Sequence, residues 1–183
     1  PDRSTTTPAA EQLVTPATGW GLNAALRRRT GHLEWEVGAD ARFADGETRE
    51  RFRYMAGAFT RSRAAGGETA VAGLYAEASA ERGPWLVAGG LRVDHARQSG
   101  ARRLERDLAT RAPTLDATTG DSGDTVWTGR LGLRRALGEG WSARTAIYSG
   151  FRPATLNELH RPFRVGNDIT EANAFLKPER LAG

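Results

Sequence analysis

The sequence predicts an all-β protein, an antiparallel meander that forms a partial transmembrane β-barrel of about six to seven strands from a larger barrel. Three observations favour this fold class. Polar and apolar residues alternate strictly in several stretches. The connections between these stretches are short and long in turn. All five tryptophans fall in the apolar phase of a predicted strand.

The composition is polar for a chain of 183 residues, because only 39% of them are hydrophobic. A transmembrane β-barrel has this composition, since one face of its wall contacts lipid and the other a hydrated lumen. No apolar run approaches the ~18 residues that a membrane-spanning helix needs. All but one of the 26 basic residues are arginine, but they are interleaved with 22 acidic residues, which argues against a nucleic-acid partner. The absence of cysteine excludes disulfides and thiol chemistry.

The clearest predicted strand is 32–43. Leu33, Trp35 and Val37 share one phase of the alternation, and Glu34 and Glu36 share the other. Such period-two alternation indicates a strand with one apolar and one hydrated face. Further strands are predicted at 20–28, 69–81, 85–94, 126–136 and 141–149.

The connections also predict a barrel wall. Tight turns are expected at 30–31, 82–84 and 138–140, and long polar connections at 44–68, 95–125 and 150–176. The first of these connections is expected to contain a hairpin-like extension around 52–63, which is rich in arginine and aromatic residues. Alternate connections of an antiparallel meander lie on the same rim, so one rim carries turns and the other carries loops. Outer-membrane barrels combine short periplasmic turns with long extracellular loops in this way. A soluble sandwich would separate the two kinds only by chance.

The domain organisation follows from these segments. Residues 1–19 are predicted to be a loop, 20–149 six strands in three hairpins, 150–176 an extracellular corner, and 177–183 the start of another strand. The chain starts at Pro1 and stops within that last strand, so we expect residues 1–183 to be a fragment of a larger barrel domain.

The tryptophans lie near the strand ends. We expect Trp20 and Trp127 by the long-loop rim, and Trp35, Trp85 and Trp141 by the short-turn rim. Two aromatic girdles at the membrane interfaces would place the indole rings at the level of the lipid headgroups. The alternative is the core of a soluble sandwich, where tryptophans tend toward mid-strand positions.

Charged residues occupy the opposite phase of the strands. An arginine facing hydrocarbon at mid-depth would cost ~2–4 kcal/mol, so we expect these residues to face the lumen or a plug within it. They are Glu34, Glu36, Asp40, Arg42, Arg92, Asp94, Arg130, Arg134 and Arg144.

No enzyme, metal site or cofactor is predicted. Glu34 and Glu36 share a strand face about 7 Å apart, a distance that could serve paired carboxylates, but a hydrated lumen wall is the simpler account. His32, His95 and His160 lack the spacing of metal ligands.

The stretch that follows the last strand forms a corner with a characteristic motif. Thr155 and Glu158 fit a capping box, and Pro162 would end a helix after about one turn. The sequences GFRPATLNEL at 150–159 and LKPE at 176–179 resemble a motif of TonB-dependent outer-membrane receptors. There are two departures from it. Pro153-Ala154 inverts the usual order, and Ala174-Phe175 replaces the usual proline.

This resemblance covers 20–183 and implies the C-terminal half of a barrel of about 22 strands. It implies a lumen that holds a plug domain of the same parent chain, and a contact between the N-terminal part and the TonB energy-transducing complex. The protein would lie in outer-membrane lipid of a Gram-negative bacterium and take up a scarce metal chelate. Among such chelates, the resemblance favours a ferric siderophore. A passive porin-like or structural barrel and a soluble all-β binding module are the alternatives.

In this family, extracellular loops and the plug contact the substrate. Arginine with aromatic residues suits an anionic ligand that bears rings, although lipopolysaccharide phosphates or acidic neighbours would suit the same arginines. Arg152 falls in the lumen phase, where it could brace the corner or face the ligand. The candidate residues are Phe52, Tyr54, Phe59, Arg61 and Arg63 in one loop, and Arg152, Asn157, Arg161, Phe163 and Arg164 in the corner.

Overall fold

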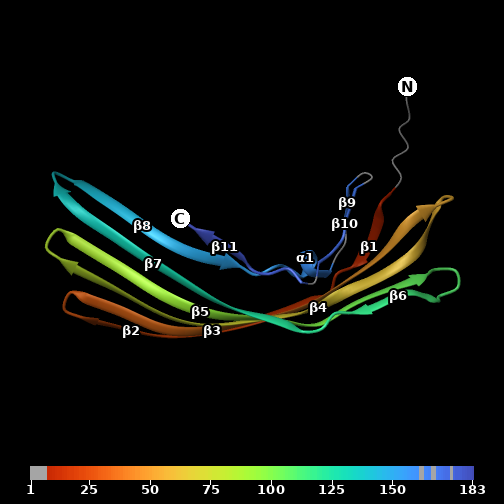
Figure 1. Ribbon diagram of the computed structural model, residues 1–183, viewed down its shortest axis with the longest axis horizontal. Coiled ribbons are helices and arrows are strands. Elements are labelled where there is room, and N and C mark those ends of the chain that lie inside the picture. The colour runs from red at the N-terminus through yellow and green to blue at the C-terminus, as the bar shows by residue number, and fades with distance from the viewer. Residues whose placement is uncertain (1–7, 161–162, 166–167, 174) are drawn as a thin grey trace, which may run out of the picture.

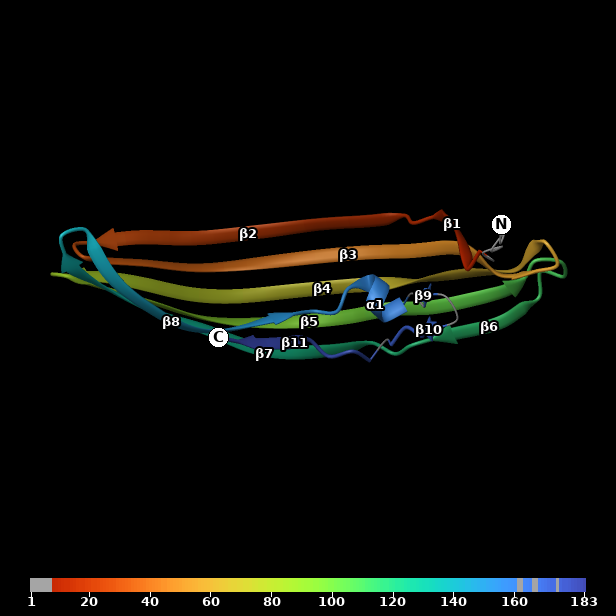
Figure 2. The ribbon, with the colours of Figure 1, turned by 90° about the horizontal axis from the view of Figure 1, so that it is seen from above.

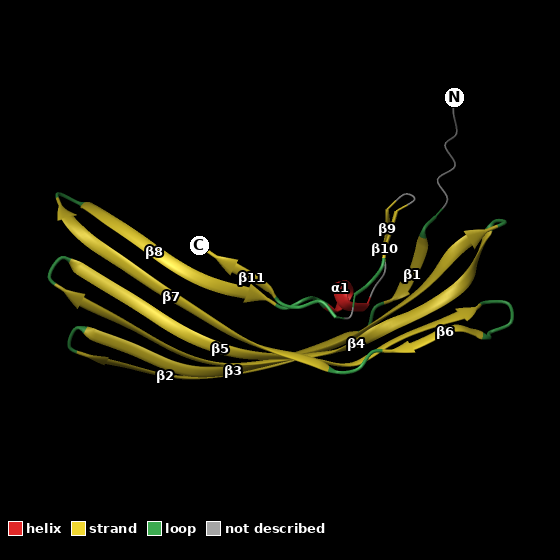
Figure 3. Cartoon of the chain, viewed as in Figure 1, coloured by secondary structure: helices red, strands yellow, loops and turns green. Residues whose placement is uncertain are grey.

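The computed structural model describes residues 8–160, 163–165, 168–173 and 175–183, which form a single curved sheet with a short corner on its concave side (Figures 1 and 3). The predicted antiparallel meander is confirmed. In the described part of the chain the sheet has nine strands in the order β1-β3-β4-β5-β7-β8-β11, with β2 also paired to β3 and β6 to β5. Strands β9 and β10 form a separate hairpin.

The strands that span the sheet lie side by side along its length (Figure 2). The elements are β1 (Ala10–Val14), β2 (Ala17–Thr30), β3 (Leu33–Met55), β4 (Ala58–Arg82), β5 (Trp85–Asp107), β6 (Pro113–Thr118), β7 (Ser122–Gly138), β8 (Trp141–Arg152), α1 (Leu156–His160), β9 (Phe163–Val165), β10 (Asp168–Thr170) and β11 (Glu179–Ala182). Among the described residues, no helix is both long and apolar enough to cross a membrane.

Several predicted loops are wrong, although the hairpin-like extension predicted around 52–63 is present where β3 turns into β4. The segments 44–68 and 95–107 continue as strands, because β3 pairs with β4 as far as Met55 and Ala58, and β4 pairs with β5 as far as Asp107. Residues 1–19 contain β1 and the start of β2, and β6 adds a seventh strand between residues 20 and 149. Charged and polar residues occur on both faces of these parts, so the sequence shows no regular apolar alternation there.

The cross-strand register separates two faces. Val37 lies opposite Leu26 and Ala76, and Ala76 lies opposite Leu91, so the convex face is apolar across four strands. Leu26 and Leu91 are 62% and 68% exposed, although burial would be expected for leucine in a soluble core. A single-layer sheet with an exposed apolar convex face is typical of a lipid-facing barrel wall.

The concave face changes phase at Gly100. Glu68 pairs with Ser99, whereas Gly66 pairs with Arg102, so one extra residue is accommodated in β5 at this point. Gly100 has φ +64°, a left-handed conformation that suits glycine at a bulge. Even-numbered residues of β5 therefore face the concave side before the bulge, and odd-numbered residues face it afterwards.

Candidate functional site

An arginine clamp joins β3 to β5 across β4 on the concave face. The Arg92 guanidinium donates to both oxygens of Asp40, at 2.5 and 3.0 Å, and to both oxygens of Asp94, at 2.7 and 2.5 Å. The clamp passes over Gly73 of β4, where a Cβ atom would collide with the guanidinium and with Asp94. Arg92 thus bridges β3 and β5 across a strand that has no side chain at that point.

A second network lies closer to the short-turn rim. The Tyr75 hydroxyl donates to Glu36 at 2.6 Å, and Arg27 donates to the other oxygen of that carboxylate at 2.6 Å. The ring of Tyr75 lies flat on Gly38, where an added Cβ would be only 2.5 Å from the ring. Together with the clamp, this network places paired charges flat against the wall.

Other charges of the predicted lumen row have fewer partners. Arg130 pairs with Glu77. Arg134 lies directly opposite Arg144 in the β7–β8 register, although like charges in facing positions destabilise a sheet. Within the described ranges, no carboxylate forms an ion pair with Arg42, Arg134 or Arg144, and Glu34 lies 3.8 Å from Arg27.

The candidate ligand residues of the first predicted loop come together on the concave face of the β3–β4 extension, meaning the part of these two strands between residues 44 and 68. Phe52 lies opposite Arg61, and Tyr54 lies opposite Phe59. The rings of Tyr54 and Phe59 meet edge to face with their centroids 5.1 Å apart, and the guanidinium of Arg63 lies 4.3 Å from the centroid of Phe52. We call these five residues the aromatic–arginine cluster.

Arg63 forms ion pairs with two buried carboxylates. Its side chain is 9% exposed and lies 3.0 Å from Glu50 and 3.9 Å from Glu105. Arg103 donates to Glu105 at 2.9 Å and to Glu171 of the corner at 2.9 Å. These ion pairs therefore fix Arg63 beneath Phe52 and connect β5 with the segment that follows β10.

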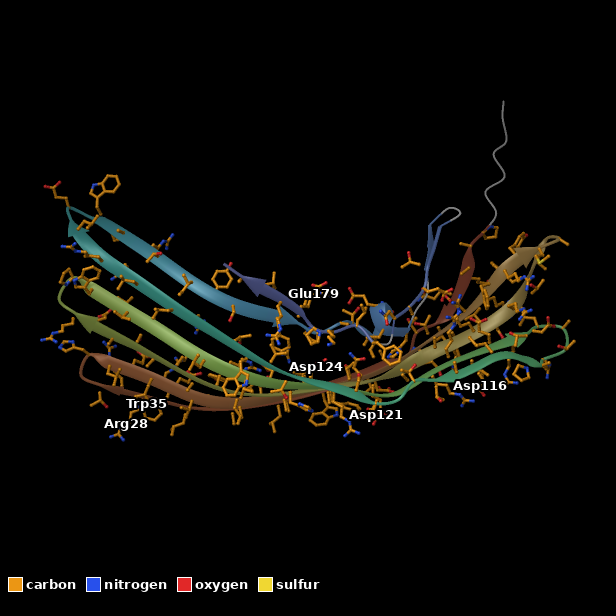
Figure 4. All side chains as sticks on the ribbon, viewed as in Figure 1. Arg28, Trp35, Asp116, Asp121, Asp124 and Glu179 are labelled. Carbon is orange, nitrogen blue, oxygen red and sulfur yellow. The ribbon has the colours of Figure 1, made fainter. Side chains whose placement is uncertain are left out.

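The corner is braced by Arg152. Its guanidinium donates to Glu158 at 3.0 and 3.1 Å and to Glu179 at 2.9 and 3.0 Å. Figure 4 shows Glu179 on the concave side. The two motif segments, 150–159 and 176–179, are thus joined through one side chain. Of the two roles expected for Arg152, the geometry shows the brace.

The predicted capping box is present. The backbone N–H and hydroxyl of Thr155 donate to Glu158 at 2.8 and 2.9 Å, and the Glu158 N–H donates to the Thr155 hydroxyl at 3.3 Å. Arg152 and Thr155 together lower the pKa of Glu158 to about 2, because both stabilise the carboxylate. This carboxylate stays ionised at any physiological pH.

Helix α1 is seated on the concave face by its buried residues. Leu159 is 1% exposed and His160 is 7% exposed. The His160 ring lies against Gly67 of β4, where an added Cβ would be 2.7 Å from Nε2. Among the described residues this buried Nε2 has no hydrogen-bond partner. The α1 seat, meaning the contact of Leu159 and His160 with β4 and β5, therefore depends on a neutral imidazole.

We expect the α1 seat to weaken as the pH falls below about 6.5. Burial lowers the pKa of His160 in the seated state, so the released imidazole binds a proton more readily. The stability of the seat is therefore complete above the ordinary pKa and is lost as the pH falls toward the lowered pKa. A fluorophore on Asn157→Cys, in a chain without other cysteines, would report this as increased mobility. The same pH response in His160→Gln would contradict the assignment.

The remaining predicted residues are placed as follows. Asn157 is exposed on α1. Arg164 and Phe163 belong to β9, whose backbone alone is described, and Arg161 lies outside the described residues. The structure therefore brings together the candidates of the first loop, and of the corner candidates it describes the side chains of Arg152 and Asn157.

All five tryptophans lie in the outward phase of the register. Trp20 stacks on Phe43 with centroids 5.8 Å apart, and Trp127 is 67% exposed on the side nearer the long-loop rim. Trp35 points to the convex side in Figure 4. Trp85, with the guanidinium of Arg135 5.0 Å from its ring, and Trp141 lie at the short-turn rim. Their role as interface girdles remains a prediction.

The sequence reasoning missed part of the site. Arg27, Tyr75 and Glu77 lie in the polar phase of their strands, and pairing β3 with its neighbours in register would have found them. Arg103 and Glu105 had no such signal, because the bulge at Gly100 reverses the phase in a segment that was predicted to be a loop.

Comparison with known proteins bears on the fold. The family model described as "TonB dependent receptor-like, beta-barrel" matches residues 2–181. The chain is similar in structure to the ferric yersiniabactin uptake receptor FyuA from Yersinia pestis, with a TM-score of 0.61 and 17% sequence identity. The match covers 76% of this chain and 21% of that chain, so this chain spans about a fifth of the receptor's length. No curated protein matches the chain.

Proposed function

Because the chain belongs to the TonB-dependent receptor β-barrel family, we propose that it forms the wall of an outer-membrane receptor for active uptake of a ferric siderophore or a similar metal chelate. The family resemblance predicted from the motifs at 150–159 and 176–179 is confirmed. This is a family of transport receptors rather than enzymes, and outer-membrane transport is its activity. The ligand, the Gram-negative host and the contact with the TonB complex belong to the proposal.

The aromatic–arginine cluster is the observation that carries the ligand proposal. Phe52, Tyr54 and Arg61 lie on the concave face of the β3–β4 extension. They are nearer the long-loop end of the strands than the paired charges of Asp40 and Glu36. Aromatic faces and a guanidinium suit a ring-bearing anion, which can stack on the rings and accept hydrogen bonds. The side chain of Arg63 is buried and paired with the carboxylate of Glu50, so it is not free to bind a ligand. We therefore assign Arg63 the role of positioning the Phe52 ring.

The concave wall below is proposed to face a plug domain of the same parent protein. Arg134 and Arg144 lie opposite each other in the β7–β8 register, and a carboxylate of the plug would offset the repulsion between their charges. Arg42, which is exposed on the same face, is a further candidate for this contact.

Uptake of a ferric siderophore by cells that carry the whole receptor tests the proposal. We expect Arg61→Ala and Phe52→Ala each to lower affinity by about tenfold, the change that follows the loss of one good stacking or charged contact. Arg51→Ala is the matched control, because Arg51 lies on the convex face of the same strand and pairs with Glu11. Uptake that continues without TonB would instead identify a passive porin-like barrel.

A further inference from the structure

A small cavity lies between the corner and the concave face of the wall. Strands β4, β5 and β7 form its wall side, and the corner residues Pro153, Ala154 and Pro178 line its other side. These three residues belong to the two motif segments, 150–159 and 176–179, which Arg152 joins to each other. The cavity therefore marks the place where the motif meets the wall.

The cross-strand register explains why the wall side of the cavity is polar. Two neighbouring rows of the concave face line it, and each row crosses three strands. The rows, read from β4 through β5 to β7, are Thr69, Gln98 and Ser122 and then Val71, Ala96 and Asp124. The first row supplies two hydroxyls and an amide, and the second supplies a carboxylate. Four polar side chains thus border one small space under the corner.

Gln98 brings a buried acceptor to this space. Its Oε1 is buried and has no hydrogen-bond partner among the described residues. The corner offers few donors, because Pro153 and Pro178 have no backbone N–H. Asp124 forms no ion pair with another described residue, and a carboxylate adds acceptors rather than donors. A buried acceptor without a partner is destabilising, so the arrangement lacks a donor at this point.

The size of the cavity suits one water molecule. The space open to the centre of a water molecule is about 20 Å³, and one water needs roughly 10–15 Å³ by this measure. A water molecule has two hydrogens to donate and two lone pairs to accept with. It can therefore serve an amide oxygen and a carboxylate and still accept from hydroxyl groups, as buried waters with about three hydrogen bonds do.

We propose that this cavity is a binding site for one ordered water molecule, which donates a hydrogen bond to Oε1 of Gln98 and joins the corner to the wall. Its second hydrogen and its lone pairs serve Asp124 and the hydroxyls of Thr69 and Ser122, which line the same space. The brace of Arg152 joins the two motif segments to each other, and the water holds them against β5. The inference does not depend on the identity of the transported ligand.

A high-resolution crystal structure of the whole receptor tests the site directly. We expect one water within about 2.5–3.2 Å of Oε1 of Gln98, and none in Ala96→Val, whose added methyl groups fill the space. A dry cavity in the parent receptor, or a protein N–H or O–H that donates to this Oε1, would overturn the proposal. So would an atom surrounded by six or more oxygens at about 2.4 Å, which would be a calcium ion.

The hold on the corner has its own readout, the mobility of a fluorophore on Asn157→Cys. Ala96→Val should raise the ratio of released to seated corner about tenfold, as expected when a buried acceptor loses its partner. Adding Gln98→Leu should restore most of the parent ratio, because it removes that acceptor.

Ala88→Val is the matched control for this readout, because Ala88 has the same concave phase on β5 but lies outside the cavity. Heat-resistant gel mobility verifies assembly of each variant. Equal mobility of the parent and Ala96→Val would show that no water holds the corner. A double variant that is more mobile than Ala96→Val would trace the release to overpacking, and would also overturn the proposal.

Discussion

Replacing Arg152 with alanine is expected to lower ligand uptake by the whole receptor about tenfold while the barrel still assembles, since a corner that is seated in about a tenth of the molecules lowers apparent affinity by that factor. The change removes the only described link between Glu158 and Glu179. It leaves two carboxylates near each other and releases the second motif segment. No apolar surface of the lipid-facing wall changes, so the strands still pair.

Uptake, ligand binding and heat-resistant gel mobility would be measured together for this variant. Arg152→Lys should lie between the parent and Arg152→Ala, because lysine keeps the charge but lacks the planar fork that reaches both carboxylates. Arg180→Ala is the matched control in the neighbouring strand, where Arg180 pairs in register with Phe151 on the opposite phase. Normal uptake by an assembled Arg152→Ala receptor would show that the brace has no part in transport.

Gly67→Ala is expected to unseat α1. The new methyl group would lie 2.7 Å from Nε2 of His160 and 3.3 Å from Cα of Ala101, so the imidazole has to leave its position. Overpacking of this kind costs about 1–3 kcal/mol. Burial of Leu159 contributes about 2 kcal/mol to the seat, so the two effects are comparable and the released state becomes substantially populated.

The mobility of a fluorophore on Asn157→Cys would measure the release of α1. Adding His160→Ala to Gly67→Ala should restore the seat, because it removes the ring that meets the new methyl group. Gly132→Ala is the control on the concave face of β7, where an added Cβ would lie 3.9 Å from its nearest described neighbour, an ordinary contact. If the double variant is as mobile as Gly67→Ala alone, the His160–Gly67 contact does not hold the helix.

The membrane part of the fold was predictable because lipid imposes a pattern on the sequence. Between residues 32 and 43 each side chain faces either lipid or the lumen, and the alternation of Leu33 and Glu34 records that choice. The capping box at Thr155 and Glu158 was predictable for a similar reason, since a helix start requires particular side chains at fixed spacing.

The extension beyond the membrane was not predictable in this way. Every residue of β6 is exposed, so this strand has no apolar face that would reveal it in the sequence. The contact between Arg103 and Glu171 joins residues that are far apart in the sequence, and its side of the sheet depends on the bulge at Gly100. Backbone pairing decides these positions, and single-residue patterns do not record it.

The glycines beneath Tyr75 and Arg92 have a consequence for movement through the lumen. Because both side chains lie flat over Gly38 and Gly73, and their polar groups are already bonded to Glu36, Asp40 and Asp94, this stretch of wall is smooth and has few unused hydrogen-bonding groups. A polypeptide displaced past it would break few bonds to it. A moving polypeptide would then bind this wall mainly at arginines that form no ion pair among the described residues, such as Arg42, Arg134 and Arg144.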